Sequence, residues 1–226
     1  GVLRSGIEGL SERLRKSVGK PYKNDFIVES VRKAIEQGRH GMFFYLIMDL
    51  PGETDADFDE FLTMLHRIEE IPGCEELVLV PSPSVFMPSP HTAMEYDMIH
   101  YDRDYGSKWY NLFRGHGMVG GVNKPWKFQM AERARIFGPS ARVLSMVSTR
   151  SGSEFIEIEK ELKRKKLISI SADGRVSCKD LKGLVDSLRP FGGVEKYCGI
   201  YTAETAPWKV LTISDRKTFL QAQGEC

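Results

Sequence analysis

Short apolar runs alternate with amphipathic segments over the first eighty residues of the chain. Val2–Ile7 and Met42–Met48 have the length and apolar character of strands, and Leu77–Pro81 is a third run of this kind. The continuous run at Met42–Met48 is typical of a strand that is buried on both faces. Strands that alternate with helices predict β-α-β units, so we expect the three strands to lie side by side in a parallel sheet.

The segments between these runs have helical spacing. We expect Ser11 to cap a short helix over Glu12–Val18, and Asn24 to cap a second helix that ends at Gly38. Thr54 and Asp57 have the spacing of a capping box for a third helix. The apolar faces of the second and third helices are expected at Ile27, Val28, Val31, Ala34, Ile35, Phe58, Phe61, Leu62, Leu65 and Ile68.

Polar residues follow the expected strands at their carboxyl ends. Glu8 follows the first strand and Asp49–Thr54 follow the second. The third is followed by Pro81–Pro90, where four prolines in ten residues predict a loop. The carboxyl ends of parallel strands lie at one edge of a sheet, where α/β proteins place functional groups. The basic residues Arg13, Arg15, Lys16 and Lys20 are expected on a solvated helix face, with contact to an anionic ligand as the alternative.

The alternation of expected strands and helices ends after the prolines. We expect a mostly helical connecting segment over residues 97–150 and a small α+β domain over residues 151–226, after a first domain of residues 1–96. The last domain is expected to contain helices at Ser153–Lys166 and Leu181–Leu188, a hairpin of Leu167–Ser171 with Val176–Cys178, and a strand pair of Glu195–Tyr201 with Trp208–Ile213.

Composition narrows the classes of protein. The formal net charge is +1, which does not indicate a nucleic-acid or membrane-surface binder. The longest apolar run is well short of the ~18 residues that span a bilayer, so we expect a cytoplasmic protein. The four cysteines show no metal-ligand spacing and predict neither a zinc site nor a disulfide framework.

Three segments, in this order, carry a resemblance to a known family. They are Ser5-Gly-Ile-Glu-Gly-Leu-Ser-Glu-Arg-Leu-Arg-Lys-Ser-Val-Gly-Lys20, Leu46-Ile-Met-Asp-Leu-Pro-Gly-Glu-Thr54 and Pro88-Ser-Pro-His-Thr-Ala-Met-Glu-Tyr96. Together they resemble the radical SAM superfamily, in particular the branch that often carries an N-terminal cobalamin-binding domain. The resemblance covers roughly residues 1–96 and no later part of the chain.

The resemblance implies a fold, cofactors and a site. The fold is the C-terminal half of a partial (β/α)6 TIM-like barrel, whose strand ends bind S-adenosylmethionine beside a [4Fe-4S] cluster, with cobalamin as a further cofactor in that branch. Glu8 and Ser11 would face the ribose or amino-acid end of S-adenosylmethionine. The turn from Asp49 through Gly52 to Glu53 would lie near the adenine, and Val80 with Pro81 would line its pocket.

Two departures qualify this resemblance. The family usually has glycine where this chain has Asp49, and the cluster motif Cys-x3-Cys-x2-Cys is absent from the chain. We therefore expect a C-terminal fragment of a radical SAM enzyme whose cluster is held by a preceding part of the same protein. Such a half barrel would have an open edge strand, so the isolated chain is expected to associate with itself.

Two other interpretations remain open. One is a non-catalytic half-barrel subunit for binding or assembly, and the other is a complete α/β enzyme that uses Glu8, Asp49 and His91 for acid-base chemistry. The sequence does not identify a substrate.

Overall fold

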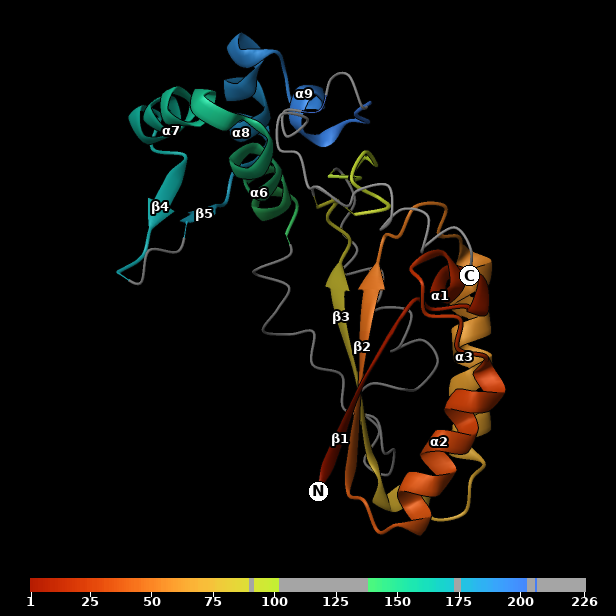
Figure 1. Ribbon diagram of the computed structural model, residues 1–226. Coiled ribbons are helices and arrows are strands. Elements are labelled where there is room, and N and C mark those ends of the chain that lie inside the picture. Colours follow the sequence, from red (N-terminus) through yellow and green to blue (C-terminus); the bar gives the residue numbers. More distant parts are fainter. Residues whose placement is uncertain (90–91, 102–137, 173–175, 203–205, 207–226) are drawn as a thin grey trace, which may run out of the picture. The chain divides into compact units, whose positions relative to one another are not determined.

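The computed structural model describes residues 1–89, 92–101, 138–172, 176–202 and 206. The chain divides into two compact units, and of the described residues the first unit contains 1–86 and the second contains the rest (Figure 1). His91 and the predicted strand Trp208–Ile213 lie outside the described residues. The three-segment division expected from the sequence stays a prediction.

The first unit is a parallel three-stranded sheet in the order β1-β2-β3, with helices between the strands. This arrangement confirms the mixed α/β class, whereas the described residues form an open sheet in which no barrel is detected. Figure 1 shows α2 and α3 along the same side of the sheet. The elements are β1 (Val2–Glu8), α1 (Glu12–Ser17), α2 (Asn24–Glu36), β2 (Gly41–Met48), α3 (Asp55–Glu69), η1 (Cys74–Glu76) and β3 (Val78–Val85).

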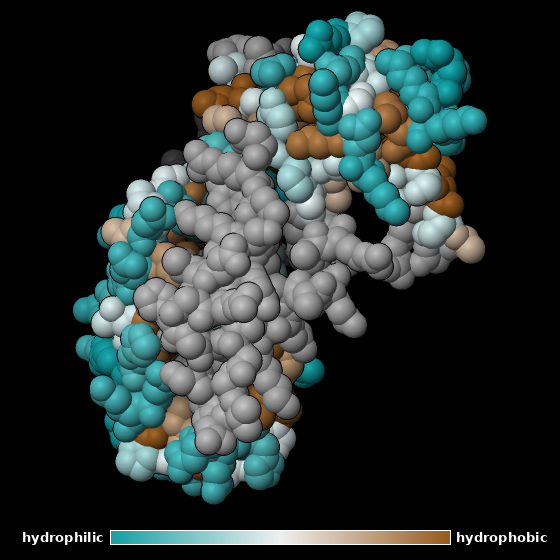
Figure 2. Space-filling view, turned by 180° about the vertical axis from the view of Figure 1, so that it is seen from behind, coloured by the Kyte–Doolittle hydropathy of each residue, from teal (hydrophilic) through white to brown (hydrophobic). Residues whose placement is uncertain are grey.

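The core of this unit lies between the helices and one face of the sheet. All five apolar positions predicted for α3 are buried, and so are four of the five predicted for α2, with Ile35 half-buried. They pack toward alternate strand residues such as Ile7 and Phe44, which are also buried. The opposite face of β2 is less covered, because Tyr45 there is exposed, so β2 is not buried on both faces as expected. Figure 2 shows hydrophilic side chains along the outer side of these helices.

The helices begin and end at capping residues that can be identified in the sequence. After α2, Gly38 adopts a left-handed conformation with φ 64°, its N–H donates to Ile35 and the next N–H donates to Ala34. The predicted capping box of Thr54 and Asp57 is also present. The start of α2 is shifted by one residue from the expectation, because Lys23 is the capping position and Asn24 is the first helical residue.

Strand β3 continues through two prolines that were expected in a loop. Pro81 and Pro83 both lie within Val78–Val85. At its start Val78 donates to the carbonyl of His40, and just beyond its end Phe86 donates to Met48, so the even-numbered residues direct their N–H groups toward β2. The odd-numbered prolines face away from β2, where a missing N–H costs no ladder hydrogen bond.

The second unit is built around a separate apolar core of helices. Its predicted helix Leu181–Leu188 and the predicted hairpin are confirmed, whereas Glu195–Tyr201 is not a strand, because α9 occupies Glu195–Cys198. In this core α6, which ends at Arg150, packs with α7 and α8. The elements are α6 (Pro139–Arg150), η2 (Gly152–Glu154), α7 (Phe155–Arg164), β4 (Ile168–Ile170), β5 (Val176–Cys178), α8 (Leu181–Leu188), η3 (Arg189–Phe191) and α9 (Glu195–Cys198).

Arg150 fixes an earlier segment to this helical core. Its guanidinium donates to the carbonyls of Tyr197 and Gly199 at 3.0 Å each, and to those of Glu95 and Asp97 at 3.2 Å each. The same group lies 4.4 Å from the centre of the Tyr201 ring. Since Arg150 is buried, these contacts hold residues 95–97 against the end of α9. In the part of the chain that the structure describes, no helix has the length and apolar character needed to cross a bilayer.

Candidate functional site at the carboxyl edge of the sheet

Two neighbouring strands each end close to a residue with a left-handed backbone conformation. Glu8, at the end of β1, has φ 59°, and Asp49, directly after β2, has φ 61°. Residues with a side chain adopt this left-handed region at a cost of roughly 1–2 kcal/mol. The register between β1 and β2 also shifts between Gly6 and Glu8. These turns place two acidic residues at one edge of the sheet, as expected from the sequence.

Glu8 forms an ion pair beside a glycine. Its Oε1 is 2.6 Å from Nζ of Lys20, and the same Nζ donates to the carbonyl of Gly6 at 3.1 Å. A side chain at Gly6 would collide with this pair, because a Cβ there would lie 2.5 Å from Oε1 of Glu8. Glu8 is half-buried.

The turn after β2 holds a carboxyl group with an unusual protonation equilibrium. The pKa of Glu53 is raised to about 7, mainly by burial and also by the charges of Asp49 and Asp57, while hydrogen bonds from the backbone of Asp49 and Leu50 oppose the shift. Oε2 of Glu53 is buried without a hydrogen-bond partner among the described residues. Such an atom is a hydrogen-bonding position that a bound molecule is able to satisfy. Gly52, with φ 76°, completes the turn.

Ser11 has a positioning role at this edge. Its hydroxyl donates to Oδ1 of Asp57 at 2.5 Å and accepts from the N–H of Leu14 at 3.2 Å, and the residue is only 1% exposed. Burial opposes ionisation of Asp57, but hydrogen bonds from Ser11, Thr54 and Arg13 lower its pKa overall. The Ser11 hydroxyl is therefore already used to tie the start of α1 to α3.

Val80 and Pro81 are both buried in β3, but they face opposite sides of the sheet. Pro81 is in register with Phe44, which faces the helices, whereas Val80 is in register with Phe43 on the other face. A pocket on one face of the sheet is therefore lined by only one of these two residues.

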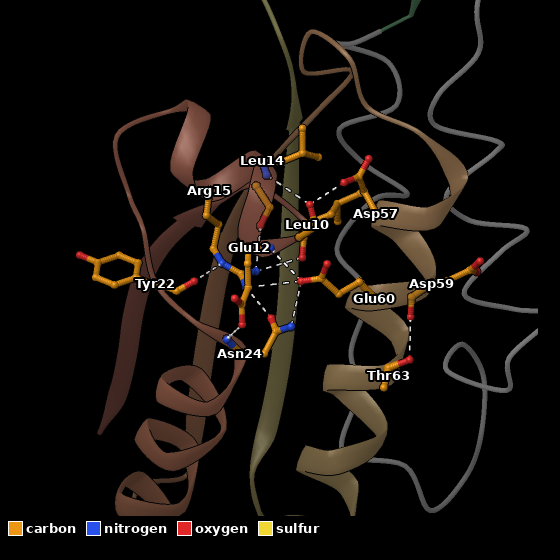
Figure 3. Close-up of polar contacts among 12 residues, drawn as sticks. Leu10, Glu12, Leu14, Arg15, Tyr22, Asn24, Asp57, Asp59, Glu60 and Thr63 are labelled. Atoms are coloured by element: carbon orange, nitrogen blue, oxygen red, sulfur yellow. Dashed lines mark hydrogen bonds and ion pairs between the residues drawn. The ribbon is translucent and has the colours of Figure 1, made fainter. Parts of the chain in front are cut away.

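A buried arginine below this edge was missed by the sequence analysis, which placed Arg15 on a solvated face. Arg15 is fully buried and donates to the carbonyls of Tyr22, Leu10 and Gly9 at 2.6, 3.0 and 3.3 Å (Figure 3). It also donates to Oδ1 of Asn24. Burial lowers the pKa of Arg15, and the charge of Glu60, whose Oε1 is 4.0 Å away, opposes that shift.

Asn24 joins α2 to this network, in contacts that no local sequence pattern signals. A second set of bonds links the same residues, because Glu60 Oε1 accepts from Nδ2 of Asn24 at 2.9 Å and from the N–H of Glu12 at 2.8 Å. Glu12 in turn accepts from the N–H of Asn24 at 2.8 Å (Figure 3). The network joins α1, α2 and α3, and thereby fixes the segment that follows Glu8.

The three cysteines that the structure describes are divided between the two units. Cys74 lies in the first unit, and Cys178 and Cys198 lie in the second. Among the described residues no group of three or more His, Cys, Asp or Glu side chains is placed to hold a metal ion. The described thiols therefore do not fit an iron-sulfur cluster.

The fold and this edge define an α/β protein with acidic groups at the carboxyl ends of parallel strands. Comparisons with protein-family models, with curated proteins and with solved structures give no match for the chain.

Proposed function

We propose that this chain is the C-terminal portion of a radical SAM enzyme and that the edge formed by Glu8 and Asp49–Glu53 helps to bind S-adenosylmethionine. The three-stranded sheet would be half of a partial (β/α)6 barrel. The Cys-x3-Cys-x2-Cys motif and the [4Fe-4S] cluster would come from a preceding part of the same protein, and any cobalamin-binding domain would lie there as well.

The observation that carries this proposal is the pair of left-handed turns at Glu8 and Asp49. They lie in two of the three segments that resemble the family, and neighbouring parallel strands bring them to one edge of the sheet. The φ of 61° at Asp49 also gives a reason why the family uses glycine at this position, since glycine adopts that conformation without steric cost. Asp49 adopts this conformation although it carries a side chain.

The residues present fit the polar groups of S-adenosylmethionine. The free oxygen of Glu8 would accept hydrogen bonds from ribose hydroxyls, with Lys20 holding the carboxylate in place. With a pKa of about 7, Glu53 is able to accept or to donate a hydrogen bond at its unsatisfied Oε2. Ser11 would position α1 without touching the ligand. When bound at a reduced cluster, S-adenosylmethionine supplies a radical or a methyl group.

The open edge of β1 is consistent with a further strand that continues the sheet. β1 is the outer strand of the described sheet, and Val2 is 50% exposed. Beside it a recess of about 160 Å³ is lined by Ile7, Phe26 and Phe44, with the exposed rings of Tyr22 and Phe26 stacked 5.7 Å apart at its rim. A further parallel strand and its helix would cover this edge and this recess. In their absence we expect the isolated chain to self-associate, which sedimentation velocity measures.

Binding of radiolabelled S-adenosylmethionine in equilibrium dialysis tests the proposal. We expect Glu8→Gln to weaken binding about tenfold or more, because it removes a charge-assisted hydrogen bond. The matched control is Glu36→Gln at the exposed end of α2, which should bind as the parent chain does. Equal affinities for the two variants would contradict the assignment of Glu8.

Translation of the coding region upstream of Gly1 tests the missing cluster motif. A Cys-x3-Cys-x2-Cys within about a hundred residues would support the enzyme, given that three thiolates at this spacing hold a [4Fe-4S] cluster with one open iron. Absence of the motif together with absence of binding would favour a half-barrel assembly subunit instead.

A further inference from the structure

The two faces of the sheet in the first unit differ in chemistry. Side chains alternate along each strand, and Ile7, Met42 and Phe44 face the recess beside α2. Arg4, Phe43 and Tyr45 therefore point to the other face. Strands of parallel sheets are usually apolar on both sides, so a cation and a phenol on this face are unusual.

Arg4 is exposed and carries no ion pair to any residue that the structure describes. Its guanidinium lies 5.6 Å from the centre of the Phe43 ring, which is the next residue across the sheet in the β1–β2 register. Such a contact between a cation and an aromatic ring is favourable and does not use the N–H donors of the guanidinium. Arg4 therefore packs on Phe43 without forming an ion pair to a described residue.

The next position along β1 on this face is Gly6, and the room left by its missing side chain is taken by the Lys20–Glu8 ion pair. Gly6 is in register with Tyr45, whose side chain is 36% exposed. Nζ of Lys20 lies on this same face, 2.9 Å from the position of a Gly6 Cβ, and its charge is balanced by Glu8. The group formed by Arg4, Lys20 and Glu8 has two cations and one anion, so it carries a net charge of +1.

We propose that Arg4, with Tyr45, binds an oxyanion, a carboxylate or phosphate group, on the face of the sheet opposite the helices. A guanidinium presents paired N–H donors that match two oxygens of such a group, and the hydroxyl of Tyr45 supplies a further donor. The assignment of this oxyanion to the substrate rests on the proposed function, which places the cofactor at the adjoining edge. The substrate is then an anionic molecule, held at a point beside Glu8.

The alternative role for Arg4 is to keep an edge strand soluble, since charged residues on edge strands prevent pairing between molecules. That role predicts aggregation after loss of the charge, and it predicts no specific binding of anions. The two roles are therefore separable by one titration.

Isothermal titration with inorganic phosphate and with acetate, at constant ionic strength, tests the proposal on the whole chain. We expect Arg4→Gln to weaken binding of both probes about tenfold, because a hydrogen bond to a charged group is lost, and Tyr45→Phe to weaken it less. The control is Arg32→Gln, which removes an exposed charge on α2 and should change nothing. No binding by the parent chain, or equal binding by Arg4→Gln and Arg32→Gln, would overturn the proposal.

Dialysis with S-adenosylmethionine on the same variants separates this inference from the proposed function. Loss of phosphate binding with unchanged S-adenosylmethionine binding in Arg4→Gln assigns the oxyanion to the substrate. Loss of both assigns the site to the carboxylate of the cofactor and overturns its assignment to the substrate. If the parent chain binds phosphate through Arg4 while Glu8→Gln and Glu36→Gln bind S-adenosylmethionine equally, the assignment of Glu8 to the cofactor fails while the oxyanion site stands.

Discussion

Replacement of Arg15 by methionine should severely destabilise the first unit. The buried guanidinium donates to three backbone carbonyls and to Asn24, and it faces Glu60. Methionine fills most of the volume but leaves these acceptors without donors. Each buried acceptor left without a donor costs about 1–3 kcal/mol, whereas the Glu60 carboxylate is 37% exposed and remains hydrated. We therefore expect the free energy of unfolding of this unit to fall by about 3–5 kcal/mol.

Hydrogen exchange measured by mass spectrometry is the suitable assay, because peptides from residues 1–86 report on the first unit alone. The expected loss corresponds to exchange in α2 that is about a hundredfold faster or more. The control is Arg67→Met, which removes an exposed ion pair with Asp25 and should cost about 0–1 kcal/mol. If Arg15→Met behaves like Arg67→Met, the network does not stabilise the junction of α1, α2 and α3.

Three further predictions concern single groups. The stability contributed by Glu53 should be fully present below pH 4.5 and should fall by on the order of 3 kcal/mol as the pH rises to about 7, because the folded state holds the proton more tightly than the unfolded state does. In Glu53→Gln this part of the pH dependence of the unfolding free energy should disappear. The same pH dependence in Glu53→Gln and in the parent chain would contradict the raised pKa. Arg150→Lys should destabilise the second unit by about 2–4 kcal/mol, since an ammonium group cannot serve four carbonyls, and unchanged exchange in peptides of residues 138–202 would refute this. Lys166→Gly should stabilise α7 by about 0.5–1 kcal/mol, because Lys166 has φ 55° just after the helix and glycine adopts this conformation without steric cost. Lys163→Gly, inside the helix, should destabilise α7 by about 1 kcal/mol. Midpoint temperatures of thermal unfolding that shift in the same direction in both variants would exclude this explanation.

Much of the first unit follows from local patterns in the sequence. The apolar stripe of α2, the capping box at Thr54 and the left-handed glycine at Gly38 act within a few residues, and the structure confirms each of them. The placement of acidic residues after β1 and β2 was also predictable, because parallel strands have their carboxyl ends on one edge. The sequence did not show that Glu8 and Asp49 share the left-handed conformation, which depends on how each turn closes.

Other features depend on contacts between distant segments, and the tertiary structure alone decided them. Whether β3 tolerates Pro81 and Pro83 depends on which side of the strand faces β2, and no local pattern records that side. The burial of Arg15 likewise requires carbonyls from a loop and a carboxylate from α3 to converge around one side chain. Periodicity along a single helix cannot distinguish a solvated arginine from a buried one, because the difference lies in the groups that other segments bring to it.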